Sequence, residues 1–443
     1  MTEPETYQSP FSWRYASPEM RALWSEQEKR RLWRRVWLAL AEAQLDYGLV
    51  SAGQLAELRA HAKEINLPRA LQIETEIRHD LMAELKTFAE QCPLGGGILH
   101  LGATSMDIED NADALRLRAG LDVLLERLRA VLRALGERAE QWADLPVMAF
   151  THLQPAEPTT LGYRLAFYAQ DLLADFHALR ALRGEIRGKG FKGAVGTAAA
   201  YCDLIGVENF PAFESRLSDL LDLPFFAVAT QVAPRRQEYT LLSALAGLGA
   251  SLSKFAFDLR LLQSPPLGEL SEPFGARQVG SSAMPFKRNP IQSEKINSLA
   301  RTLAAMPLTA WHNAAHSLLE RTLDDSANRR TLLPEAFLTV DELLLTALKI
   351  LQGLRLDEYA VQRNLAAYAP FAATERVMMA LARKGADRQE THERLREHAL
   401  AAWAEVQRGA ENPLLARLLA DPAFTALLSV EELRALFDVG DYT

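Results

Sequence analysis

Apolar residues recur along this chain mostly at intervals of three and four positions, which is the spacing of one face of an α-helix. One stripe runs from Leu121 to Leu135, and a second, cleaner one runs from Leu241 to Leu262. Small residues stand beside the second stripe, so a neighbouring helix could approach it closely. A third run extends from Phe337 to Leu354, after Pro334, where a proline begins or kinks a helix. These patterns predict long helices packed in a bundle.

Strand signals are nearly absent, because no convincing run of alternating β-branched residues is flanked by turn pairs. The expected fold class is therefore all-α. Pro and Gly cluster at residues 92–97 and again from Pro265 to Pro290, which indicates loops at both places. Boundaries near residues 104 and 355 predict three helical domains, namely an N-terminal domain (1–104), a central long-helix bundle (105–355) and a C-terminal domain (356–443).

The composition is that of a globular protein with more than one domain. Of its 443 residues, 49% are hydrophobic and 24% are charged. The formal net charge of −8 disfavours nucleic-acid binding, and an anionic ligand would need locally concentrated positive charge. The two cysteines, Cys92 and Cys202, indicate no disulfide framework or thiolate metal site. Residues 1–12 lack the apolar segment of a secretory signal, so we expect a cytoplasmic protein.

The segment with the most chemical information is Gly280–Pro290 (GSSAMPFKRNP), in the loop between two helical patterns. Its glycine and serines allow backbone amides to approach an anion closely. Lys287 and Arg288 supply positive charge, and Asn289 can both donate and accept hydrogen bonds. A flexible basic surface loop ahead of a helix explains the same residue types equally well. The composition of the segment favours neither interpretation.

A resemblance that covers almost the whole chain favours the chemical interpretation. GSSAMPFKRNP resembles the signature loop of the fumarase/aspartase superfamily, whose members eliminate fumarate from substituted succinates. The rest of the chain is similar to the adenylosuccinate lyase family, in the branch that includes the animal enzymes. The matching segments are RYASPEM (14–20), RHD (78–80), HLGATS (100–105), THLQPAEPTT (151–160), KGAVGT (192–197) and ERTLDDSANRR (320–330).

This resemblance implies a function, an assembly and a fold. Members of the family remove fumarate from adenylosuccinate, giving AMP, and from the succinyl-aminoimidazole carboxamide ribotide, giving the carboxamide ribotide, in purine biosynthesis. The small-molecule substrates are therefore nucleotides, and neither a cofactor nor a metal is implied. The family forms homotetramers whose active sites are shared between subunits. The fold implied is three helical domains around a long central bundle.

The resemblance also assigns catalytic roles. Ser281, the first serine of the pair, would be the general base, with its alkoxide stabilised by nearby amides and by Lys287. Lys287 would in addition bind the substrate carboxylate on which negative charge builds up. His152 would be the general acid that protonates the departing nitrogen, a role that suits imidazole near neutral pH. Ser282 is interpreted as a packing residue of the loop.

The remaining matches would bind the substrate. Arginine offers a fork of donors that suits a phosphate, although any one of these arginines taken singly is more often part of a surface salt bridge. Where the animal enzymes carry arginine after the signature loop, this chain has Lys295, which keeps the charge but loses the planar fork. The expected contacts are Arg14, Tyr15, Arg78, His79 and Asp80 around the phosphate and ribose, Thr104, Ser105, Thr151, Gln231 and Asn289 around the succinyl portion or base, and Arg321, Ser326 and Arg330 near the phosphate and base.

Three other patterns have simpler interpretations. His312 and His316 could face one side of a helix as metal ligands, but no acidic partner completes a recognised site. The basic cluster Lys29–Arg35 would suit nucleic acid, yet the tryptophans around it fall on the opposite stripe, which favours a solvated helix face or a subunit contact. The apolar stretch Tyr239–Leu262 is interrupted by charges and is interpreted as a buried helix rather than a membrane span.

The sequence leaves two alternative functions beside the one that the family resemblance implies. Another lyase of the superfamily, such as argininosuccinate lyase or the carboxymuconate cycloisomerase, would share the signature loop. RYASPEM and RHD favour a nucleotide monophosphate instead. An inactive binding or structural protein is disfavoured because Ser281, His152 and Lys287 are all intact.

Overall fold

The structure is a computed structural model that describes residues 6–442. Residues 1–5 and 443, which belong to the predicted N-terminal and C-terminal domains, lie outside the described residues, as does the start of the segment in which we expect no secretory signal. The chain divides into two compact units, so the predicted three-domain division stays a prediction. Unit 1 comprises residues 1–129, 174–252 and 298–345, and unit 2 comprises residues 130–173, 253–297 and 346–443.

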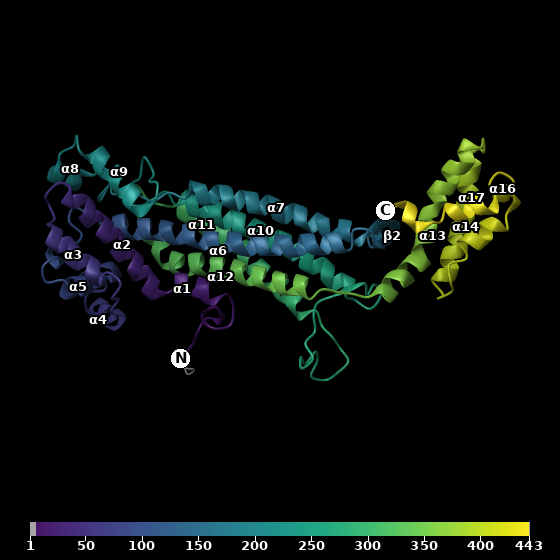
Figure 1. Cartoon of the computed structure of the whole chain (residues 1–443), viewed down its shortest axis with the longest axis horizontal. Coiled ribbons are helices and arrows are strands. Elements are labelled where there is room, and N and C mark those ends of the chain that lie inside the picture. The colour runs from purple at the N-terminus through teal and green to yellow at the C-terminus, as the bar shows by residue number, and fades with distance from the viewer. Residues whose placement is uncertain (1–5, 443) are drawn as a thin grey trace. The chain divides into compact units, whose positions relative to one another are not determined.

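Helices dominate both units (Figure 1). The described chain is 67% helical with little sheet, which confirms the all-α fold class. The division between the units falls inside the long helices of the predicted bundle. These are α6 (Ser105–Gln141), α7 (Leu161–Glu185), α10 (Arg236–Leu262), α11 (Ile291–Ala315) and α12 (Asp324–Gln352).

The predicted apolar stripe from Leu241 to Leu262 is buried along α10. None of the seven large apolar residues that form the stripe is more than 8% exposed. By length and composition alone α10 could cross a membrane, but its apolar stripe is covered by other parts of the protein. In unit 1 a side chain at Gly249 would lie 2.9 Å from Leu303 of α11, so the missing side chain permits close packing of these two helices. The third run also forms a helix, but α12 begins at Asp324 and includes Pro334.

Unit 1 also contains the shorter elements of the N-terminal half of the chain. Serine side chains begin several of them: Ser17 and Ser25 accept hydrogen bonds from backbone amides of the first turn, and Ser51 forms a capping box with Gln54. The elements are η1 (Pro10–Ser12), α1 (Pro18–Leu23), α2 (Glu26–Leu45), α3 (Ala52–His61), α4 (Leu67–Ile77), α5 (Asp80–Gln91), η2 (Gly96–Ile98), α8 (Ala199–Ile205) and α9 (Phe210–Leu221).

The basic cluster at Lys29–Arg35 is not a solvated helix face throughout. Arg30 and Arg34 of α2 are fully buried, so that interpretation is wrong for these two residues. The reason is that other helices supply counterions: Arg34 Nε lies 2.7 Å from a carboxylate oxygen of Glu84, and Arg30 lies 3.2 Å from Glu74. A buried arginine is tolerated where paired carboxylates satisfy it.

Unit 2 contains an antiparallel hairpin that the sequence pattern did not predict, formed by β1 (Pro146–Thr151) and β2 (Gln154–Thr160). Its strands escaped notice because prolines interrupt them and because the turn is neither Asn-Gly nor Asp-Gly. The register shifts between Met148 and Phe150. A second, two-residue pairing joins β3 (Leu270–Ser271) to β4 (Arg355–Leu356).

The C-terminal helices of unit 2 form their own apolar core and also support the hairpin. Val377, Leu395 and Phe424 belong to that core. The long helix α13 packs against both strands of the hairpin, where Phe150 and Tyr368 meet edge to face at a centroid distance of 6.4 Å. The elements are α13 (Glu358–Arg383), α14 (Arg388–Val406), α15 (Leu414–Leu419), α16 (Pro422–Thr425), α17 (Val430–Ala435) and η3 (Val439–Tyr442).

Candidate functional site

The RHD segment forms the corner between α4 and α5 in unit 1. Arg78 ends α4 in the left-handed conformation (φ 53°), and His79 caps α5 by accepting a hydrogen bond from the Met82 amide at 3.4 Å. Both side chains are exposed. Asp80, the first residue of α5, is mostly covered and lies 2.9 Å from the guanidinium of Arg330. The corner thus places an arginine and a histidine at the start of a helix, which favours anions.

The beginning of α6 lies beside this corner. The Thr104 amide donates to Asp107 at 3.0 Å and so caps the helix. The Ser105 hydroxyl lies 3.5 Å from Nε2 of His79, which brings the HLGATS and RHD segments together. Two segments more than twenty residues apart in sequence are therefore adjacent in unit 1.

The ERTLDDSANRR segment leads into α12 and contributes the other side of the site. The Gln231 amide donates to the carbonyl of Glu320 at 3.3 Å, which holds Gln231 next to Arg321. The Nη1 atom of Arg321 is buried and has no hydrogen-bond partner among the described residues. A buried guanidinium nitrogen without an acceptor is costly unless a ligand supplies one.

These segments enclose a cavity of about 460 Å³, which we call the polar cavity. Most of the side chains expected to bind substrate line it, and they come from four separate stretches of the chain. Glu74, Met106, Glu109 and Leu323 complete the lining and were not predicted. The predicted residues that line it are Arg78, His79, Asp80, Thr104, Ser105, Gln231, Arg321, Ser326 and Arg330.

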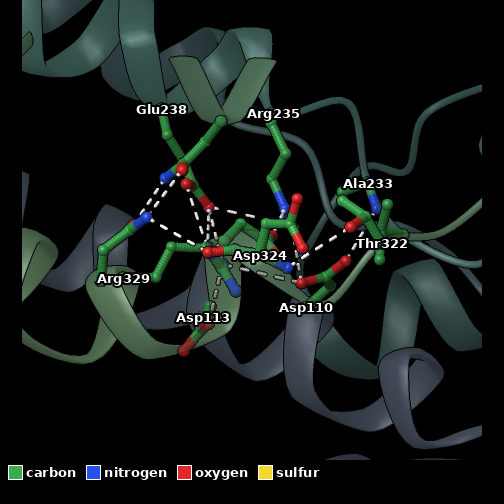
Figure 2. A network of polar contacts seen from close by, with 12 residues as sticks. Asp110, Asp113, Ala233, Arg235, Glu238, Thr322, Asp324 and Arg329 are labelled. Carbon is green, nitrogen blue, oxygen red and sulfur yellow. Dashed lines mark hydrogen bonds and ion pairs between the residues drawn. The ribbon is translucent and has the colours of Figure 1, made fainter. Parts of the chain in front are cut away.

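An ion-pair network fixes the helices next to the polar cavity (Figure 2). Arg235 lies 2.9 Å from Asp110 of α6 and 2.6 Å from Asp325 of α12, so one buried guanidinium joins two helices. Arg329 is paired with Glu238 of α10 at 2.6 Å. Burial alone would raise the pKa of Asp110, but the charges of Arg235 and Arg329 outweigh it and lower that pKa. The network holds α6, α10 and α12 in fixed register.

A second network is centred on Asp107, a fully buried residue that sequence reasoning missed. Its carboxylate accepts hydrogen bonds from the amides of Lys192 and Gly193, from the Tyr201 hydroxyl at 3.2 Å and from the buried ammonium of Lys189. The KGAVGT segment is thereby attached to the start of α6. Its signal in the sequence was a carboxylate two residues after HLGATS, where the predicted central bundle begins.

Two of the predicted phosphate and ribose ligands do not line the polar cavity. Arg14 and Tyr15 follow η1, and both of their amides donate to the carbonyl of Pro10. The Arg14 guanidinium is exposed and lies 5.7 Å from the ring of Trp13. The next residue, Ala16, is anchored through its amide to Glu342 of α12 at 2.8 Å. The segment is therefore fixed at its C-terminal side, and neither candidate side chain lines the polar cavity.

The candidate acid His152 occupies the two-residue turn of the unit 2 hairpin. His152 and Leu153 both have positive φ (53° and 61°), which strains non-glycine residues. The neighbouring Thr151 pairs with Gln154 at the end of the strands. The imidazole is exposed and makes no hydrogen bond or ion pair within residues 6–442. A strained turn thus presents an imidazole without a partner to its surroundings.

The signature loop lies between β3 and α11 in unit 2. The Ser281 hydroxyl oxygen accepts hydrogen bonds from the amides of Ala283 (3.3 Å) and Met284 (3.0 Å). Asn289 donates to the Gly280 carbonyl at 3.1 Å and closes the base of the loop. A side chain at Gly280 would lie 2.0 Å from the Lys287 carbonyl, so only glycine permits this closure. The loop therefore aims two amides at the serine oxygen.

The other residues of this region are less enclosed. Lys287 and Ser282 are exposed on the loop, and Lys295 is half-buried in the first turns of α11. No hydrogen bond in the described part of the chain joins His152 to Ser281 or Lys287. A single chain thus assembles the polar cavity, while its candidate acid and base remain unconnected to one another.

Comparison with known proteins places the chain among lyases. A sequence profile described as "Lyase" matches residues 14–304, and one described as "Adenylosuccinate lyase C-terminus" matches residues 370–443. The chain is 40% identical to the adenylosuccinate lyase of Schistosoma mansoni (97% of this chain, 91% of the relative) and 39% identical to that of Saccharomyces cerevisiae (99% and 92%). Its fold resembles that of the 3-carboxy-cis,cis-muconate lactonizing enzyme from Pseudomonas putida (TM-score 0.87, 27% identity, 98% and 96% covered).

Proposed function

Because the chain belongs to the adenylosuccinate lyase family of the fumarase/aspartase superfamily, we propose that Ser281, His152 and Lys287 carry out the proton transfers of its reaction. The protein is a carbon–nitrogen lyase that releases fumarate from adenylosuccinate, giving AMP, and from the succinyl-aminoimidazole carboxamide ribotide. Both substrates share a phosphoribosyl group and a succinyl-amine, so one site can serve both.

The reaction places three demands on the site. A weakly acidic proton must leave a carbon next to a carboxylate, which requires a base at that carbon. The carbanion spreads its charge onto the carboxylate, which requires cations and oriented amides there. The departing nitrogen must receive a proton, which requires an acid on its side of the bond.

Ser281 meets the first demand if its alkoxide is stabilised. The amides of Ala283 and Met284 already donate to its oxygen, and such donors bind the ionised hydroxyl more strongly than the neutral one. Lys287, on the same loop, adds a positive charge for the alkoxide and for the substrate carboxylate. Asn289 helps to hold that carboxylate. The two amides distinguish Ser281 from Ser282, which we assign to packing.

His152 meets the third demand as the general acid. It is exposed and unpartnered in the described chain, so its ring nitrogens remain available to a ligand rather than being committed to a neighbour. Thr151, at the end of the same strand, would contact the succinyl portion. The hairpin turn holds both residues outward, and α13 supports the strands behind them.

The polar cavity is the observation that carries the assignment of the nucleotide end. We assign the phosphate and ribose to Arg78, His79, Asp80 and Arg330, with Arg321 and Ser326 nearby. The unpartnered Nη1 atom of Arg321 supports an anionic ligand there. The residues assigned to the succinyl portion or base are Thr104, Ser105 and Gln231.

Arg14, Tyr15 and Lys295 lie outside the polar cavity, so we assign them to a site completed by other subunits. The protein would then be a homotetramer with shared active sites, three helical domains per subunit and a cytoplasmic location. Exposed apolar side chains on the long helices support self-association, since Tyr163 is 75% and Leu308 is 63% exposed.

Subunit mixing tests this arrangement. Ser281→Ala and His152→Ala proteins would each be nearly inactive, and reversible dissociation of an equal mixture should restore activity in about a quarter of the sites, because the two side chains come from different subunits. The matched control mixes Ser281→Ala with Lys287→Ala. Those two residues share one loop, so every site keeps one defect and no activity should return. Absence of recovery in the first mixture would contradict shared sites.

A further inference from the structure

Glu109 of α6 lies in the wall between two cavities of unit 1. It lines the polar cavity, and it also lines a smaller cavity of about 80 Å³ that shares Asp80, Ser326 and Arg330 with it. Its side chain is half-buried, and its carboxyl group makes no hydrogen bond or ion pair with any residue in 6–442. An acid without a partner in the wall of an anion-binding cavity requires a physical explanation.

The neighbouring acids each have a cation, whereas Glu109 has none. Asp110 and Asp113 stand on the same helix, and Asp80 stands at the start of α5. Three nearby guanidinium groups are already paired with these three carboxylates, so ionised Glu109 would face the like charges of Asp80, Asp110 and Asp113 without a paired counterion. The pairs are Asp80 with Arg330 (2.9 Å), Asp110 with Arg235 (2.9 Å) and Asp113 with Arg329 (3.1 Å).

The charge state of Glu109 follows from this setting. Burial, followed by the charges of Asp80, Asp113 and Asp110, raises the pKa of Glu109 to about 8, against a smaller opposing effect of Arg330. Glu109 therefore carries a proton at neutral pH. The other charged or titratable groups in the walls of the two cavities are Lys29, Glu74, Arg78, His79, Arg116 and Arg321.

We propose that Glu109 sets the pH range in which the polar cavity binds its phosphorylated ligand: as a neutral acid it donates a hydrogen bond to a phosphoryl oxygen, and as a carboxylate it repels the phosphate. The proposal rests on the assignment of this cavity to the phosphate end of the substrate. A phosphate monoester carries close to two negative charges above neutral pH, so an ionised acid beside it opposes binding. Binding at alkaline pH is then accompanied by uptake of one proton on Glu109.

The test is the binding of AMP, the reaction product, measured by titration calorimetry between pH 7 and pH 9.5. AMP avoids the catalytic proton transfers, and its phosphate is already ionised throughout this range. Wild-type affinity should weaken about fivefold from pH 8 to pH 9, with proton uptake visible in buffers of different ionisation enthalpy. Glu109→Gln keeps a neutral donor, so it should bind as the wild type does at pH 7 and change little up to pH 9.

A control and a second variant separate the possible outcomes. Glu335→Gln removes another acid whose pKa burial raises, but Glu335 lines neither cavity, so this variant should keep the wild-type pH profile. A wild-type slope that persists in Glu109→Gln, or a wild-type affinity that does not change with pH, would overturn the role of Glu109. If Arg330→Ala binds AMP as tightly as the wild type, the cavity assignment itself is wrong and the proposal falls with it.

Discussion

Two regions of the molecule differ in how firmly a single chain holds their side chains in place. One is the polar cavity of unit 1, and the other comprises the hairpin and the signature loop of unit 2. In the cavity, helix ends and buried ion pairs hold nine of the predicted substrate-binding residues around one space. In unit 2, His152 and Lys287 are exposed, and His152 has no partner in the described chain. Binding residues are therefore prearranged by a rigid scaffold, while the proposed proton-transfer residues stand on a turn and a loop.

This difference fits the distinct demands of binding and elimination. A phosphate needs donors in fixed positions, and helix ends supply them at little entropic cost. An acid and a base must meet the substrate only when it is bound, and a loop of small residues suits closure over a ligand. The hairpin stores strain at His152 and Leu153, as functional turns often do.

Loss of the proposed base should have the largest effect. Ser281→Ala should lower kcat by about a thousandfold or more, because it removes the hydroxyl to which the two loop amides donate. The measurement is the loss of adenylosuccinate absorbance. Ser282→Ala is the matched control and should stay close to wild type. Equal rates for Ser281→Ala and wild type would remove this serine from the mechanism.

Loss of the proposed acid should rank second. His152→Gln keeps the polarity and approximate size of the side chain but cannot donate a proton as an acid, so kcat should fall about a hundredfold. Substrate affinity should change little, since the polar cavity of unit 1 is intact. Steady-state kinetics on adenylosuccinate separates the two quantities. A change confined to KM would show that His152 binds substrate instead.

A substitution in the polar cavity should raise KM rather than lower kcat, and its effect should be weaker than the two preceding ones. Arg330→Ala removes the cation next to Asp80, so KM should rise about tenfold while kcat changes less. Arg69→Ala is the control, because Arg69 forms a comparable pair with Glu90 on the surface. A fall in kcat with unchanged KM would contradict the assignment of Arg330 to ligand binding and weaken the contrast between the two regions.

Relief of strain in the hairpin should have the smallest effect. Leu153→Gly removes the cost of a positive φ at a residue whose side chain is 70% exposed. The free energy of unfolding should therefore increase by about 1 kcal/mol. Leu153→Ala is the control, because alanine keeps the strained backbone and should gain nothing. Thermal unfolding checks both variants. Equal stability of the glycine and alanine variants would show that this turn is not strained.

The fold class and many substrate-binding residues could be predicted because their signals lie within short segments of the sequence. The spacing of leucines along α10 reports a buried face directly, and that face is buried. The matched segments RHD, HLGATS and ERTLDDSANRR supplied side chains that line one cavity, although nothing in their spacing shows that they meet. Each segment carries its own chemistry in the sequence.

The features that escaped prediction depend on partners far away in the chain. Arg30 and Arg34 looked solvated because their counterion, Glu84, lies about fifty positions later. The hairpin was missed because its prolines and its His-Leu turn lack the usual strand and turn signals. The unusual setting of Glu109 arises from Asp80 and Arg330, which only folding brings to it.

The sequence by itself determined the helical periodicity, the family and the chemical types available for the reaction, since these depend on residue identity and short-range spacing. The tertiary structure decided which charges are buried and paired, which acid is left without a partner, and which candidate ligands share one cavity. Burial and electrostatic interaction depend on distances between segments, and those distances exist only once the chain has folded.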